Sequence, residues 1–132
     1  MPVESLSVHP ELDRDLAPIL EETRGLLVYQ EQAMQVARSF AGMSYDEAEL
    51  CRRDMMSTLE HVRVNRLREF AAGVEASGYS KEAAEALSEW ISEGLFHATC
   101  KAHATSCALI TYWGAYLKAH FPVEFDEARR AQ

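Results

Sequence analysis

The chain has 132 residues, of which 48% are hydrophobic and 26% charged, and a formal net charge of −8. This length suits one helical domain over 1–132, with an extended arm over 1–9, while the acidic balance argues against a chain that holds nucleic acid alone. The start of the chain lacks the pattern of a secretory signal, no stretch is long enough to span a membrane, and three cysteines without framework spacing favour a cytoplasmic location.

Helix start and stop signals then follow one another along the chain. Pro10 suits a first helical turn, Gly25 and Gly42 suit helix ends, and Ser44 with Glu47 has the spacing of a capping box. The pattern predicts helices over about 10–23, 29–41, 44–57, 59–76, 80–93 and 102–119, and a last one from 122 onward.

The 102–119 stretch contains Leu109, Ile110, Trp113 and Tyr116, so that apolar side chains occur on nearly every side of the predicted helix. A helix of this kind is usually a buried central helix. We therefore expect an all-α fold, a compact non-repeating array of about six to seven helices around a buried helix near 102–119.

Metal-ligand residue types recur at helical spacing near the start of this central helix. Two interpretations are a zinc site and a cysteine–histidine catalytic pair, but neither has the ligands or the orienting group that would complete it. We therefore expect no metal and no cofactor. The residues concerned are His97, Cys100, His103 and Cys107.

Basic residues gather in one segment of this acidic chain. Residues 51–70 hold five arginines and three acids. Arg63 and Arg66 lie in the apolar arc of their predicted helix, so their side chains either extend past apolar neighbours to the edge of the core or line a polar cavity.

The chain resembles the fingers region of the bacterial C-family replicative DNA polymerase, the α subunit of polymerase III. The resemblance runs from about His9 to Phe125 and is carried by blocks in the family's order. These blocks read VYQEQ at 28–32, AELCRR at 48–53 and YLKAHFPVEF at 116–125, with Lys101 and His103 between the last two.

In that family the paired arginines and the lysine face the triphosphate of the incoming nucleotide. The resemblance therefore implies one anion pocket formed by Arg52, Arg53, Lys101 and His103, with Arg63 and Arg66 as further anion-binding candidates and His103 as a catalytic candidate. The metal-binding carboxylates of the family's palm are not in this sequence, so we expect that the chain is not itself a polymerase.

The main functional hypothesis is a helical subunit that holds a phosphate- or sulfate-bearing small molecule together with a second protein. One candidate is the small subunit of two-component biosynthetic enzymes that close aziridine rings by sulfate elimination, although whether the chain catalyses any reaction stays open. One alternative is a non-catalytic, polymerase-mimicking interaction or regulatory protein. Another is an accessory module that binds nucleotides or DNA.

Overall fold

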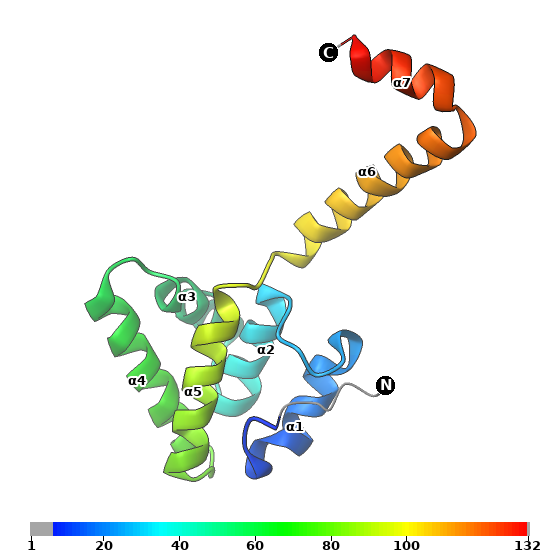
Figure 1. Cartoon of the computed structure of the whole chain (residues 1–132). Helices are drawn as coiled ribbons and strands as arrows, with labels where there is room; N and C mark the ends of the chain where they lie inside the picture. The colour runs from blue at the N-terminus through cyan, green and yellow to red at the C-terminus, as the bar shows by residue number, and fades with distance from the viewer. Residues whose placement is uncertain (1–6, 132) are drawn as a thin grey trace. The chain divides into compact units, whose positions relative to one another are not determined.

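The computed structural model describes residues 7–131, and the regular elements in that part of the chain are helices (Figure 1). One isolated bridge, between Tyr29 and Thr99, is the only strand-like pairing there. The all-α prediction is confirmed. The elements are α1 (Pro10–Leu20), the 3-10 helix η1 (Glu21–Thr23), α2 (Gln30–Ala41), α3 (Tyr45–Met55), α4 (Glu60–Ala76), α5 (Lys81–Leu95), α6 (Lys101–His120) and α7 (Pro122–Arg130).

The chain divides into two compact units between Thr99 and Cys100. Helices α1 to α5 belong to the first unit, and α6 and α7 belong to the second. That 1–132 forms a single domain stays a prediction. Of the arm expected over 1–9, residues 1–6 lie outside the described part of the chain, and residues 7–9 precede α1 without regular structure. Each helix of residues 7–131 falls short of the length or the apolar character that a membrane span requires.

Polar caps begin two helices of the first unit, and the sequence predicts the one at Ser44. The Ser44 hydroxyl accepts a hydrogen bond from the Glu47 amide at 3.2 Å, and the Glu47 carboxylate accepts one from the Ser44 amide at 2.7 Å. The capping box at the start of α3 is therefore confirmed. Ser80 caps α5 in a similar way, because its hydroxyl accepts from the Ala83 amide at 3.2 Å.

The hydrophobic core lies within the first unit, between α1, α2, α3, α4 and α5. Phe40 of α2, Phe70 of α4 and Leu87 of α5 are among its largest fully buried side chains. The helices α1 and α3 contribute Leu12 and Met55 to the same core. Removal of this apolar surface from water is the main force that stabilises the unit.

Gln32 of α2 is the one buried polar side chain among the described residues, at 5% exposure. Its side-chain oxygen accepts hydrogen bonds from the Val28 and Tyr29 amides at 3.0 and 2.9 Å. Its side-chain nitrogen donates to the Thr23 hydroxyl at 2.7 Å and to the Ile19 carbonyl at 3.3 Å. Gln32 therefore fastens the turn after α1 and the segment before α2 to the start of α2.

The helix predicted near 102–119 is present as α6, but its own unit does not bury it. No residue of α6 is buried, and Ile110 and Trp113 are 64% and 55% exposed. Within its own unit α6 packs against α7, which has 9 residues against the 20 of α6 and cannot cover so long a helix. Apolar content made α6 a candidate for burial, but it did not specify which neighbour would bury it.

Candidate functional site

Four of the predicted anion-binding residues lie on two packed helices of the first unit. Arg52 and Arg53 occupy the last turn of α3, while Arg63 and Arg66 lie one turn apart on α4. The position of the first pair has a local reason, since cations at the end of a helix interact favourably with its dipole. We call these four residues the arginine group.

Arg52 is held by a carboxylate and an amide of the same unit. Its Nη2 and Nε donate to the two carboxylate oxygens of Glu49 at 2.7 and 2.9 Å, which is a two-point pairing one helical turn away. Its Nη1 donates to the side-chain oxygen of Gln30 at 3.3 Å. The hydrogen bonds from Arg52 hold the pKa of the Glu49 carboxyl below its ordinary value, against the opposing effect of burial.

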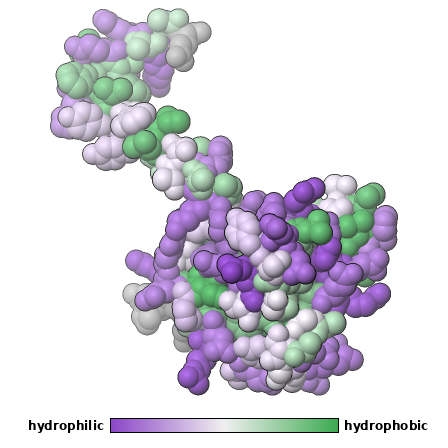
Figure 2. All heavy atoms as spheres, turned by 180° about the vertical axis from the view of Figure 1, so that it is seen from behind, coloured by the Kyte–Doolittle hydropathy of each residue, from purple (hydrophilic) through white to green (hydrophobic). Residues whose placement is uncertain are grey.

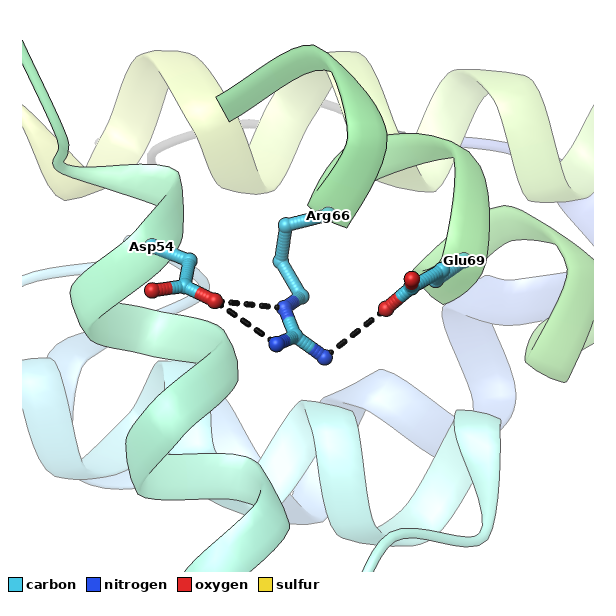
Figure 3. A network of polar contacts seen from close by, with 3 residues as sticks. All are labelled: Asp54, Arg66 and Glu69. Atoms are coloured by element: carbon cyan, nitrogen blue, oxygen red, sulfur yellow. Dashed lines mark hydrogen bonds and ion pairs between the residues drawn. The ribbon is translucent and has the colours of Figure 1, made fainter. Parts of the chain in front are cut away.

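Arg66 lies between two carboxylates, as Figure 3 shows. Its Nε and Nη2 converge on one oxygen of Asp54, at 3.0 and 2.6 Å, and its Nη1 donates to Glu69 at 2.9 Å. The hydrogen bond to Asp54 is the main reason that the pKa of the Arg66 guanidinium is raised. Because Asp54 belongs to α3 and Arg66 to α4, this contact also joins the two helices.

The other two members of the arginine group differ in their surroundings. Arg63 is half-buried, and its Nη1 donates to the Ser57 carbonyl at 3.2 Å, just after the end of α3. Arg53 is exposed and makes no hydrogen bond or salt bridge with the described residues. Both Arg63 and Arg66 thus extend from the edge of the core toward polar partners, the first of the two arrangements that the sequence left open.

Lys101 and His103 belong to the second unit, where they are exposed in the first turn of α6. The His103 Nε2 atom lies 3.5 Å from the Cys107 sulfur, one turn further along. Their predicted convergence with Arg52 and Arg53 on one pocket stays a prediction, as does the catalytic role of His103. Within residues 7–131, no group of three or more histidine, cysteine or acidic side chains is arranged to hold a metal ion.

Large apolar side chains lie at the surface of both units. Figure 2 shows hydrophobic residues among the outer atoms of the second unit and in separate patches on the first. On α6 they include Tyr112, Tyr116 and Leu117, at 65%, 48% and 47% exposure. Tyr116 also contacts His120, with ring centroids 4.2 Å apart. Exposed apolar surface of this kind is typical of a helix that contacts another macromolecule.

Sequence reasoning identified the arginines but missed the side chains that hold them. Glu49 and Glu69 lie three residues from Arg52 and Arg66, a spacing that places neighbours on one helical face and could have revealed them. Asp54 lies 12 residues from Arg66 on another helix, so only the packing of α3 on α4 brings the two together. Gln30 lies 22 residues from Arg52, so the sequence spacing gives even less indication of this contact.

The first unit is an all-α module of five α-helices in which the packed pair α3 and α4 carries the arginine group. The chain belongs to the bacterial DNA polymerase III alpha subunit finger domain family, whose model matches residues 4–91. The resemblance seen in the sequence is therefore confirmed.

Similar curated proteins carry the description DNA polymerase III subunit alpha. The Saccharopolyspora erythraea protein is 41% identical over 121 residues, which are 92% of this chain and 10% of that protein. The Mycobacterium leprae protein is 42% identical over 118 residues, which are 89% of this chain and 10% of that protein. The Thermus aquaticus protein is 40% identical over 125 residues, which are 94% of this chain and 10% of that protein. The chain thus spans about a tenth of the length of these relatives.

These matches overturn the main functional hypothesis. They relate the chain to the finger domain family of DNA polymerase III alpha subunits and not to a subunit that holds a sulfate- or phosphate-bearing small molecule for natural-product biosynthesis. The suggested similarity to aziridine-forming enzymes finds no support among them. Arg52 and Arg66 already pair with carboxylates of the protein, so an anion could reach either guanidinium only in competition with those carboxylates.

Proposed function

We propose that this chain is an accessory DNA-binding module that uses a polymerase fingers fold. The observation that carries the proposal is the family match over residues 4–91, which includes the whole arginine group. The relatives are described as DNA polymerases, whose substrate is a polyanion. The α3–α4 face is where this acidic chain concentrates its arginines, so we expect the phosphate contacts there.

Arginine suits this role because its planar guanidinium can donate two parallel hydrogen bonds to phosphate oxygens. Arg53 is the most accessible member of the group and needs to break no salt bridge with a described residue before it meets a phosphate. The net charge of −8 opposes this attraction at long range. We therefore expect weak, strongly salt-dependent binding without a sequence preference.

The proposal can be tested by fluorescence anisotropy with a labelled single-stranded oligonucleotide and a labelled primer–template duplex, titrated with the full chain at several salt concentrations. Wild-type protein should bind at low salt and lose affinity as salt rises. Arg53→Ala should weaken binding and reduce the salt slope by about 0.7 to 0.9, the value for one phosphate contact. Absence of binding to both DNAs at low salt would contradict the proposed function.

Arg38→Ala is the matched control for this experiment. Arg38 is also exposed in the last turn of a helix, α2, and its removal changes the net charge by the same amount. A loss of affinity confined to Arg53→Ala identifies a local contact on the α3–α4 face. Equal losses in both variants show a response to overall charge and reject that face as the binding surface.

A second candidate function, interaction with another protein, is favoured by the exposed apolar side chains of α6. Ile110, Tyr112 and Trp113 are each more than half exposed in the second unit, and burial of such side chains is a major source of affinity between proteins. Sedimentation velocity of the chain with and without a polymerase III alpha subunit tests this role. Trp113→Ala should weaken any complex that forms, and an unchanged complex would exclude α6 as the contact.

A further inference from the structure

Arg66 is the member of the arginine group that is most fully occupied by carboxylates. Two of its N–H groups converge on a single oxygen of Asp54, at 3.0 and 2.6 Å, and a third reaches Glu69 at 2.9 Å (Figure 3). A phosphate oxygen would be held by the same donors in the same convergent manner. The Asp54 carboxylate thus occupies the position on Arg66 that a DNA phosphate would need.

We propose that Asp54 is an internal counter-ion that competes with DNA phosphate for Arg66 and thereby sets the DNA affinity of the α3–α4 face. The inference rests on the proposed function and adds to it a residue that sets the affinity for DNA. Asp54 does not contact DNA in this scheme. It determines whether Arg66 is available to do so.

The two carboxylates that hold Arg66 differ in their exposure to solvent. The side chains of Arg66 and Asp54 are 21% and 24% exposed, so their attraction is partly shielded from water and salt. The Glu69 side chain is 63% exposed, and an ion pair of that kind contributes little. Asp54 is therefore the effective competitor. Glu69 touches the same guanidinium but should yield readily to a phosphate.

The position of Asp54 strengthens its effect. It follows Arg53 directly in the chain, so it belongs to the same last turn of α3 as the accessible arginine at which we expect phosphate to arrive first. With Glu69 it gives Arg66 two carboxylates for one positive charge. Neutralising Asp54 would leave two convergent N–H donors with at most an uncharged acceptor, which a phosphate can displace, and would remove a local repulsion. Arg66 itself stays near enough to the surface to be reached.

The test is DNA binding by the full-length Asp54→Asn variant, with Glu69→Gln as its matched control. Each variant changes the net charge by the same amount and removes a carboxylate from the same guanidinium. Asparagine keeps an oxygen that can accept from Arg66, so the contact between α3 and α4 is retained without the charge. The probe is a fluorescein-labelled single-stranded oligonucleotide, and its anisotropy is measured at several salt concentrations.

We expect Asp54→Asn to bind about fivefold or more tightly at low salt than wild type, because a charge-assisted hydrogen bond to phosphate replaces one within the protein. The salt slope should rise by about 0.7, one further phosphate contact on a single strand. Glu69→Gln should gain clearly less. Adding Arg66→Ala to Asp54→Asn should abolish the gain, and a merely structural role for Asp54 would leave the slope unchanged.

Each outcome of this experiment decides something. If wild type binds DNA and Asp54→Asn binds no more tightly than Glu69→Gln, the counter-ion role is rejected while the proposed function stands. If none of the proteins binds, both are rejected. Asp54→Ser serves as a second neutral variant should Asp54→Asn fail to fold, as judged by its circular dichroism, and the same comparison with Glu69→Gln then applies.

Discussion

Arg52 of α3 donates a hydrogen bond to the side-chain oxygen of Gln30, the first residue of α2, at 3.3 Å. The contact joins two blocks that carry the family resemblance, VYQEQ at 28–32 and AELCRR at 48–53. It gives a structural reason for their occurrence together, because Gln30 helps to fix the guanidinium that Glu49 also holds. Two glutamines of the first block thus have distinct tasks, with Gln30 at the arginine group and Gln32 in the core.

Replacement of Gln32 by leucine should destabilise the first unit. The leucine side chain would leave the Val28 and Tyr29 amides without their acceptor and the Thr23 hydroxyl without its donor. An unsatisfied buried polar group costs about 1–3 kcal/mol, so we expect a loss of about 2–4 kcal/mol in the free energy of unfolding, measured in urea. Gln35→Leu, at an exposed position of the same helix, is the control and should change stability little.

The three cysteines should differ sharply in reactivity. Cys51 is 1% exposed in the core, and burial raises the pKa of its thiol to about 11, so little thiolate is present at neutral pH. Cys100 and Cys107 are exposed thiols on the second unit. We expect N-ethylmaleimide to add two labels to the native chain and a third only in denaturant, as mass spectrometry would show. Rapid labelling of Cys51 in the native protein would contradict its burial.

The helices could be predicted from the sequence because their signals are local. Ser44 and Glu47 lie three residues apart, and such a spacing fixes a helix start without reference to the rest of the chain. The resemblance to polymerase fingers was also readable, since it depends on the order of short blocks. The α6 helix shows where this reasoning stops, because an apolar helix can be covered by its own domain or by another molecule.

The chemistry of the arginine group was only partly predictable. Residue type and clustering showed that arginines gather over 51–70, but a cation that is available and one that is already paired look the same in a sequence. The difference at Arg66 depends on Asp54, which tertiary packing brings near. The hypothesis of a biosynthetic subunit was wrong because of the family assignment, whereas anion binding by these arginines stays a prediction.

Tyr79 should make the stability of the first unit depend on pH in the alkaline range. Burial, and then its hydrogen bond to the Asp15 carboxylate at 2.7 Å, raise the pKa of Tyr79 to about 12 from 10.0. A folded-state pKa above the unfolded value means that this contribution is fully present below pH 10 and is lost as pH rises toward 12. The measurement is the free energy of unfolding between pH 8 and 11.5 for wild type and Tyr79→Phe.

The phenylalanine variant should show a flatter stability profile than wild type above pH 10, because it has no proton to lose at this position. An ultraviolet titration of the two proteins gives a second readout. The difference between their curves is the phenolate signal of Tyr79, and its midpoint should lie near 12. A midpoint near the ordinary value of 10.0 would show that neither burial nor Asp15 acts on this phenol.

A carboxylate on α1 should produce a weaker pH dependence in the acid range. Glu11 accepts a hydrogen bond from the Ser80 amide at 3.0 Å, and this bond is the main reason that the pKa of Glu11 is lowered below 4.5. A folded-state pKa below the unfolded one gives stability that is present above the unfolded value and lost as pH falls through the folded value. Glu11→Gln should therefore flatten the stability profile below pH 4.5, whereas the exposed control Glu89→Gln should leave it as in wild type.

Gly73 of α4 lies close to the end of α2. A methyl group at this position would lie 3.0 Å from the Ala41 side chain and 3.1 Å from the Ala41 carbonyl oxygen, at the end of α2. Alanine gains about 1 kcal/mol over glycine in a helix interior, but the clash involves backbone that cannot yield unless α2 moves. We therefore expect Gly73→Ala to lower the free energy of unfolding by about 1–2 kcal/mol.

Gly114 of α6 provides the opposite case, because a methyl group there would meet no atom within 4 Å. Gly114→Ala should therefore show the higher helix propensity of alanine without a clash and raise the helix content measured by circular dichroism on heating.

The Gly73 prediction has a compensating variant. Adding Ala41→Gly to Gly73→Ala should recover part of the lost stability, since it removes one of the two clashing methyl groups. If Gly73→Ala proves as stable as wild type, the contact between α2 and α4 is looser than these distances imply.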